Sequence, residues 1–249
     1  MNSLPSWFIT LCRSALVLSL PVLITLVNVR LLMTSAFPDI EYGLPGFPAD
    51  PYGFSKAQRL YWSKRSIDYI QGLERAGRIE SWKFPEDGVS PPGTQAPPES
   101  CPAYGSDYGP RDCTYFYNDR EVKHMVDVLK VVRVAMSVLL GAGLITLVAT
   151  ALLRADGRIM DLRAGLLGGA GLTAALYLGL VLYIALNFNT LFVQFHQILF
   201  QGGTWTFLWS DSLIRLFPIR FWQDAFTFVG LAGLLEAGGV AAWAWWALH

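Results

Sequence analysis

Four long apolar stretches occur along the chain, separated by segments in which polar and charged residues dominate. The apolar stretches run over residues 7–32, 126–153, 164–189 and 222–248. A helix needs about 20 apolar residues to cross the hydrocarbon core of a bilayer, and each stretch is longer than that. Backbone N–H and C=O groups find no water inside lipid, so a spanning segment must be a helix or part of a closed barrel. The pattern therefore predicts an all-α membrane protein with four transmembrane helices.

The polar segments between these helices predict the orientation of the chain. The segment 154–163 is short and contains three arginines, and arginines in short loops stay on the cytoplasmic side. Both termini are then cytoplasmic, 33–125 forms a large extracytoplasmic domain with short helices, and 190–221 forms an extracytoplasmic interfacial loop. A cleaved signal peptide is the alternative interpretation of 7–32. We favour a retained anchor, because no basic region precedes the stretch and it is too long for a signal peptide.

Composition agrees with a membrane protein that carries a sizeable polar part. Hydrophobic residues make up 53% of the 249 residues and charged residues only 15%, against about 25% in a typical soluble domain. Lys and Arg balance Asp and Glu at 19 each, which excludes the basic surface that nucleic-acid binding requires. Mean hydropathy is +0.38, which is modest for a wholly embedded chain and fits the large domain at 33–125.

The large domain is predicted to contain a helix and an irregular stretch. Ser55 is a candidate N-cap, and Gly77 stands where the helix could end. Residues 85–102 contain six prolines and are predicted to be irregular. The apolar stripe that predicts the helix consists of Leu60, Ile67, Ile70 and Leu73.

Cysteine positions fit an extracytoplasmic location for this domain. Cys101 and Cys113 both fall in the predicted outer domain, where thiols are oxidised. Proline and glycine between them permit a turn, so we predict that they form a disulfide; two free thiols are the alternative. Cys12 lies in the first apolar stretch and is interpreted as a packing residue.

Two of the three histidines are predicted to meet at one membrane surface. His124 precedes the helix 126–153 and His196 follows the helix 164–189, so the topology brings both to the extracytoplasmic side. Imidazole titrates near neutrality, and two imidazoles at one depth can divide the work of base and acid. The alternative is two unrelated interfacial histidines, each satisfied by water or backbone.

Carboxylates near His124 add to this hypothesis. If the helix begins near Asp119, then Glu121, His124 and Asp127 fall along adjacent turns of one face. Asp127 would then orient the imidazole and stabilise its protonated form, as a carboxylate does in hydrolase triads. Alternatively, both carboxylates are polar residues at a helix end. We predict no metal site, because zinc needs three protein ligands and no HExxH-type spacing is present. No GxSxG elbow is present for a serine nucleophile.

The segment after His196 is predicted to lie on the membrane surface. Gly202 and Gly203 interrupt the preceding helix. Ser210 and Asp211 can cap a short amphipathic helix with Arg215 on its polar side, which would rest on the outer leaflet. The apolar residues of this segment are Trp205, Phe207, Trp209, Leu213, Ile214, Leu216 and Phe217.

Glu236 is the one carboxylate near the middle of an apolar stretch. A charge within lipid is costly, so Glu236 either pairs with Arg13 of the first stretch or is protonated. So few polar groups at mid-membrane, with no inverted repeats, argue against a transporter.

The residues around both histidines resemble a known family. The motifs are YNDREVKHMVDV at 117–128 and FHQILFQGGTWTFLWSDSLIRLFPIRFW at 195–222, and they look like the bacterial integral-membrane lipoprotein intramolecular transacylase family. The segment FSKAQRLYWSKRSIDYIQG, 54–72, is similar to the first extracytoplasmic helix of that family. The resemblance covers most of the chain, while 85–113 looks longer and richer in cysteine than the family pattern.

This resemblance implies an enzyme of the bacterial cytoplasmic membrane that uses no cofactor. Its partners would be membrane lipids and a lipoprotein in the outer leaflet whose N-terminal cysteine carries an S-diacylglyceryl group and a free α-amine. The sn-2 acyl chain would move to that amine, giving an N-acyl, S-monoacylglyceryl (lyso-form) lipoprotein. Alternative functions are another membrane lipid hydrolase or acyltransferase that uses the same histidines, and a non-catalytic membrane assembly or sensor module.

The resemblance also implies roles for individual residues. His124 would be the base, and His196 the acid or the oxyanion donor, although these roles can be exchanged. The implied supporting residues are Tyr117, Asn118, Glu121 and Asp127, and the implied substrate-binding residues are Trp205, Asp211 and Arg215.

Overall fold

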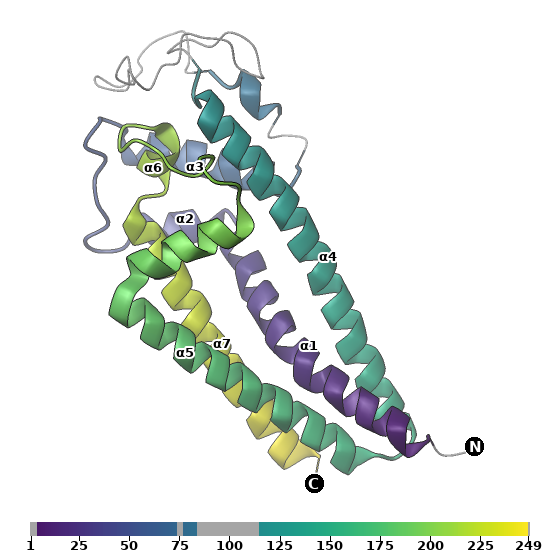
Figure 1. Ribbon diagram of the computed structural model, residues 1–249. Helices are drawn as coiled ribbons and strands as arrows, with labels where there is room; N and C mark the ends of the chain where they lie inside the picture. The colour runs from purple at the N-terminus through teal and green to yellow at the C-terminus, as the bar shows by residue number, and fades with distance from the viewer. Residues whose placement is uncertain (1–3, 74–76, 84–114, 249) are drawn as a thin grey trace. The chain divides into compact units, whose positions relative to one another are not determined.

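The computed structural model describes residues 4–73, 77–83 and 115–248, and this part of the chain is helical (Figure 1). Its long helices are α1 (Ser6–Leu32), α4 (Asp119–Ala155), α5 (Ile159–Leu199) and α7 (Ile219–Ala247). Each is long and apolar enough to cross a membrane. The described residues contain no β-strand, only an isolated antiparallel bridge between Lys83 and Tyr115. The predicted all-α class with four spanning helices is therefore confirmed.

The chain divides into two compact units. The first comprises Met1–Leu32, Val134–Phe188 and Ala225–His249, and the second comprises Met33–Arg133 and Asn189–Asp224. Asn187 interrupts the helical geometry of α5, with φ of −160° and ψ of 77°. Two helical stretches therefore make up α5, and the interruption lies close to the boundary between the units.

Small residues allow close helix packing in the first unit. A Cβ placed on Gly169 of α5 would lie 3.0 Å from the main-chain oxygen of Leu16 in α1. A Cβ on Gly233 of α7 would lie 2.5 Å from the ring of Tyr177 in α5. Without side chains at these positions the helices approach closely, as is common where helices pack within lipid.

Glu236 pairs with a different residue from the one predicted. Asn28 Nδ2 donates to Glu236 Oε2 at 2.7 Å, whereas Arg13 Nη1 lies 3.5 Å from Asp161 Oδ1. The predicted pairing of Glu236 with Arg13 is wrong because Arg13 and Asn28 lie fifteen residues apart on α1, roughly 22 Å along the helix axis. Glu236 therefore connects α7 to α1 through Asn28, and Arg13 pairs with Asp161 near the start of α5.

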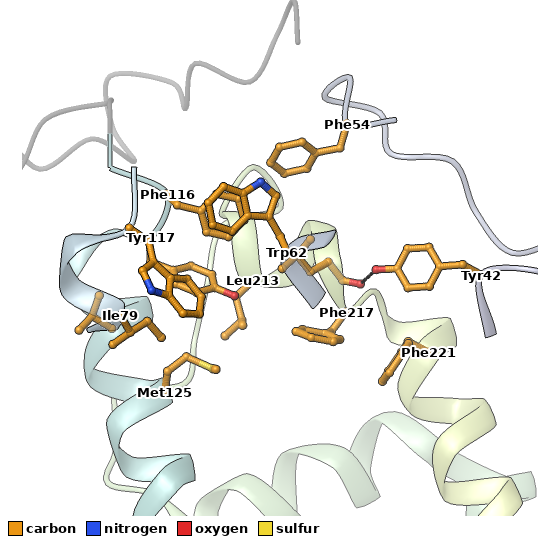
Figure 2. Packing of buried hydrophobic residues seen from close by; sticks show 13 residues of the cluster. Tyr42, Phe54, Trp62, Ile79, Phe116, Tyr117, Met125, Leu213, Phe217 and Phe221 are labelled. Atoms are coloured by element: carbon orange, nitrogen blue, oxygen red, sulfur yellow. Dashed lines mark hydrogen bonds between the residues drawn. The ribbon is translucent and has the colours of Figure 1, made fainter. Parts of the chain in front are cut away.

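An aromatic core holds the second unit together (Figure 2). Trp62 stacks on Phe116 with ring centroids 3.9 Å apart, and the hydroxyl of Tyr42 donates to the carbonyl of Leu216. Tyr117, predicted to support His124, is fully buried, and its hydroxyl lies 2.7 Å from that of Ser66 in α3 (Lys56–Ile70). The buried members of the core are Tyr42, Phe54, Trp62, Ile79, Trp82, Phe116, Tyr117, Val122, Met125, Leu213, Leu216, Phe217 and Phe221.

The helix predicted after Ser55 is α3, Lys56–Ile70. Ser55 caps it as expected: its side chain accepts from Gln58 N, and the Gln58 side chain accepts from Ser55 N. The predicted end at Gly77 is wrong, because Gly72 takes a left-handed conformation with φ of +70°. The N–H of Gly72 bonds to Tyr69 O and that of Leu73 to Asp68 O, which is the Schellman termination.

The short helix predicted on the membrane surface is α6, Ser212–Leu216, and it is largely buried. Leu213 and Leu216 belong to the aromatic core, and the Arg215 side chain is buried as well. The apolar side of α6 therefore packs inside the protein, and Arg215, predicted on the polar side of this helix, has a buried partner, Asp50, within the same unit. The remaining short elements are α2 (Ala36–Glu41) and the 3₁₀ turn η2 (Ile79–Ser81).

The stability of the second unit is expected to fall as pH rises from about 4.5 to about 7. Burial of Glu41 in α2, together with the nearby Asp224 carboxylate, raises the pKa of Glu41 to about 7. The folded protein thus keeps a proton that the unfolded chain releases, so stability is complete below the unfolded value and declines up to pH 7. The thermal midpoint of detergent-solubilised protein should be lower at pH 8 than at pH 5.

Glu41→Gln should make this pH dependence shallower, since glutamine carries no titratable proton. Asp39→Asn is the matched control on the same helix, because Asp39 is exposed and pairs with Lys64 at 2.7 Å. Parallel midpoint curves for the wild type and Glu41→Gln would contradict the assignment.

Candidate functional site

His124 and His196 lie side by side in the second unit. His124 is in the second turn of α4, and His196 is in the last turn of α5. Their ring centroids are 6.0 Å apart and their planes differ by 22°. Both side chains are buried, with 6% and 8% of their surface exposed. The structure therefore brings together two imidazoles from distant parts of the chain, close enough for both to contact one small functional group.

Aromatic rings surround the pair. Phe200 contacts both histidines, with ring centroids 4.8 Å from His124 and 5.5 Å from His196. Phe207 contacts His124 at 5.3 Å, and Trp205 contacts His196 at 5.2 Å. We call these rings the aromatic shell; its members are Phe192, Phe195, Phe200, Trp205 and Phe207. Phenyl rings offer no strong hydrogen-bond donor, so the shell is mainly apolar.

A main-chain carbonyl orients His196. Its Nδ1 lies 2.8 Å from the carbonyl oxygen of Phe192, one helical turn earlier. A carbonyl oxygen can only accept a hydrogen bond, so Nδ1 carries the proton in the neutral ring. Nε2 then has a free lone pair and can accept a proton from a reacting group.

His124 does not have the carboxylate partner that the sequence suggested. Its Nδ1 is buried and has no hydrogen-bond partner among the described residues. The Asp127 carboxylate instead accepts from Lys130 Nζ at 2.8 Å, on the partly exposed side of α4. The surrounding protein therefore fixes the tautomer of His196 through a hydrogen bond at Nδ1, and it makes no such bond to Nδ1 of His124 among the described residues.

The first turn of α4 is fixed by Asn118 and Glu121. Asn118 Oδ1 accepts from the N–H of Glu121 at 3.0 Å, and Glu121 Oε2 accepts from the N–H of Asn118 at 2.8 Å. This reciprocal arrangement satisfies two backbone donors at the helix start. The second carboxylate oxygen, Oε1, accepts from the N–H of Leu213 at 2.6 Å. Glu121, one turn before His124, thus joins α4 to α6.

Asp211 links the loop of the aromatic shell to the same turn. Its carboxylate accepts from Asn118 Nδ2 at 3.0 Å, from Arg120 Nη2 at 3.4 Å and from Leu208 N at 2.8 Å. Burial raises the pKa of the Asp211 carboxyl above its ordinary value, and these hydrogen bonds only partly offset that effect. The segment that carries Trp205 is therefore attached to α4 beside His124.

Arg215 is held by a partner that sequence reasoning missed. Its Nε and Nη2 bond to the Asp50 carboxylate at 3.2 and 2.8 Å, and Nη2 also bonds to the carbonyl of Tyr52 at 3.3 Å. The guanidinium lies 3.6 Å from the ring centroid of Phe54. Predicted as a substrate-binding residue, Arg215 in the structure forms a buried ion pair within the core.

Other site residues were absent from the sequence predictions. Phe192 and Phe200 stand four residues before and after His196, so helical spacing was the only signal that pointed to them. Asp50 follows an irregular stretch and has no periodic pattern around it. The predicted disulfide between Cys101 and Cys113 lies outside the described residues, whereas Cys12 is buried in α1. No group of three or more His, Cys, Asp or Glu side chains gathers in the described ranges as a metal site would require.

Most of the chain matches a known family. The protein family described as lipoprotein intramolecular transacylase Lit matches residues 13–222. An uncharacterized protein of Aquifex aeolicus (strain VF5) is 25% identical over 225 residues, which cover 88% of this chain and 87% of that protein.

Solved structures share the fold. The membrane-integral lipoprotein intramolecular transacylase Lit of Bacillus cereus superposes with a TM-score of 0.60 at 18% identity, over 96% of this chain and 94% of that one. A variant of that protein with a histidine replaced by alanine superposes with a TM-score of 0.54 at 17% identity, over 96% of this chain and 93% of the variant.

Proposed function

Since the chain belongs to the lipoprotein intramolecular transacylase family, we propose that it moves the sn-2 acyl chain of a lipoprotein's S-diacylglyceryl cysteine to the α-amine of that cysteine. The product is an N-acyl, S-monoacylglyceryl lipoprotein. Donor and acceptor belong to one molecule, so positioning replaces a bimolecular encounter and no acyl-enzyme is needed.

The reaction requires three contributions from the protein. The α-amine, with a pKa near 8, must lose a proton as its nitrogen attacks the ester carbonyl carbon. The carbonyl oxygen becomes an oxyanion, which requires a hydrogen-bond donor. The bond from the acyl carbon to the glyceryl oxygen then breaks, and that oxygen must gain a proton. Overall, one proton passes from nitrogen to oxygen, and the protein returns to its starting state.

The pairing of His124 with an oriented His196 is the observation that carries this proposal. Nε2 of His196 has a free lone pair because Phe192 fixes the proton on Nδ1. We therefore assign His196 as the base, which exchanges the roles suggested by the sequence motifs. The imidazolium formed at His196 transfers this proton to His124, whose ring centroid is 6.0 Å away, and His124 gives it to the leaving glyceryl oxygen, so both rings end neutral.

We further propose that the site faces the outer leaflet of the bacterial cytoplasmic membrane, with both termini cytoplasmic. Three arginines lie where α4 meets α5: Arg154 in the last turn of α4, Arg158 in the loop and Arg163 near the start of α5. This end of both helices would remain on the cytoplasmic side. Chain connectivity then assigns the opposite ends of these helices, where His124 and His196 occur, to the extracytoplasmic side. A lipoprotein's glyceryl ester lies at that surface.

Tandem mass spectrometry of a co-expressed lipoprotein tests the proposal. Because the transfer is intramolecular, the N-terminal lipopeptide should keep its mass while its fragments show an N-linked acyl chain. Its α-amine should also stop reacting with an amine-specific label. His124→Ala is the matched inactive control and should leave a diacyl lipopeptide with a free amine.

The other functions give a different mass or a free α-amine in the same experiment. A lipase would release one acyl chain and leave the amine free, and an acyltransferase that uses a separate lipid donor would add one acyl chain. An unchanged diacyl lipopeptide with the wild-type chain would favour a non-catalytic role and overturn the proposal.

A further inference from the structure

Trp205, beside the histidine pair, carries a hydrogen-bond donor that has no partner in the part of the chain that the structure describes. The indole Nε1 of Trp205 is shielded from solvent and makes no hydrogen bond with any of the described residues. Buried indole N–H groups usually find an acceptor, because an unmet donor costs free energy. A donor left unpaired next to a reactive pair indicates that its acceptor arrives with the substrate.

The indole of Trp205 lies where it can donate a hydrogen bond to a substrate group beside His196. Its ring centroid is 5.2 Å from that of His196, and the two planes are inclined by 37°. The loop that carries Trp205 turns at Gly203, where φ is +85°, and the carboxylate of Asp211 attaches this loop to α4. Neighbouring Thr204 uses its hydroxyl to donate to Gln201 O at 3.0 Å, so that hydroxyl is already engaged.

The rest of the aromatic shell cannot supply such a donor. Its other members are phenylalanines, and Nδ1 of His196 is occupied by the carbonyl of Phe192. Proton transfer engages Nε2 of His196 and the ring of His124 under the proposed function. Within the aromatic shell, this leaves the indole N–H of Trp205 as the neutral donor for an oxyanion at the acyl carbonyl.

We propose that the Trp205 indole N–H is the oxyanion donor: it binds the carbonyl oxygen of the sn-2 acyl group and stabilises the negative charge that forms when the amine adds. This assignment rests on the proposed transacylation and turns a residue expected to bind substrate into a catalytic one. The N–H needs to break no existing bond before it acts, and its apolar surroundings strengthen the interaction as charge develops.

An isosteric replacement tests the N–H itself. Substitution of Trp205 by 3-benzothienylalanine keeps the bicyclic ring and replaces N–H by sulfur. We expect kcat for N-acylation to fall by about 10²- to 10³-fold, with KM and the thermal midpoint little changed, because the donor acts mainly in the transition state. Trp205→Phe should lose at least as much activity.

Trp209 provides the matched control on the same loop. It is 75% exposed and contacts neither histidine among the described ring contacts, so Trp209→Phe should keep kcat within about threefold of the wild type. A benzothienylalanine variant at position 205 with kcat within about threefold of the wild type would overturn the assignment of Trp205. That outcome differs from failure of the proposed function, in which the wild type itself would form no N-acyl product.

Discussion

Replacement of His196 by alanine is expected to lower the rate of N-acylation by about 10³-fold at pH 7, within the range that general acid–base catalysis contributes. The variant loses the Nε2 lone pair that takes the proton from the attacking amine. His196→Gln should lose nearly as much, because an amide of similar size has no basic nitrogen. Residual activity would come from substrate positioning alone. Initial rates on a purified diacylglyceryl lipopeptide in detergent, with products analysed by tandem mass spectrometry, measure the loss.

The pH dependence separates catalysis by His196 from a structural role. The substrate's α-amine deprotonates with a pKa near 8, so at pH 9 most of it is already a free base. The deficit of His196→Ala should therefore shrink between pH 7 and pH 9. A rate within tenfold of the wild type at pH 7, or a deficit that is the same at every pH, would contradict the assignment of His196 as base.

Removal of Asp50 is expected to destabilise the protein by about 3–5 kcal/mol, because it leaves the Arg215 guanidinium buried without its counter-charge. Both side chains are almost completely inaccessible, at 2% for Arg215 and 0% for Asp50. For a chain of this size that loss corresponds to a fall of roughly 10 °C in the thermal midpoint. Asp50→Ala measured by intrinsic tryptophan fluorescence in detergent checks the prediction.

Two companion variants make this test specific. The double variant Asp50→Leu with Arg215→Met should be less destabilised than Asp50→Ala, since replacement of a whole buried pair leaves no unpaired charge. The exposed pair of Arg78 and Glu80 is the control, and Arg78→Ala should cost less than about 1 kcal/mol. Equal midpoints for Asp50→Ala and Arg78→Ala would contradict the importance of the buried pair.

Much of the fold was predictable because the bilayer imposes strong rules on sequence. Length and apolarity identify the helices that become α1, α4, α5 and α7, and topology alone brings His124 and His196 to one surface. Helix ends were less predictable: α4 begins at Asp119, seven residues before the apolar stretch, because Asn118 and Glu121 cap it.

The parts of the site that escaped prediction depend on tertiary contacts. Arg215 can be buried in α6 because Asp50 neutralises its charge, and nothing in the local sequence of either residue indicates the other. The helical spacing that suggested Asp127 as the partner of His124 was sound, but Lys130 lies within reach of the same carboxylate and occupies it. Local pattern indicates which residues share a helix face, whereas the partner that each finally binds depends on the whole unit.

The hydrogen bond between His196 and the carbonyl of Phe192 does not depend on the side chain at position 192. The orienting group belongs to the main chain, so it is present whatever side chain residue 192 carries, and no single substitution of that side chain deletes it. The base and its support together occupy one helical turn. One turn of α5 therefore supplies both the imidazole and the acceptor that orients it, and the histidine is the one side chain that this arrangement requires.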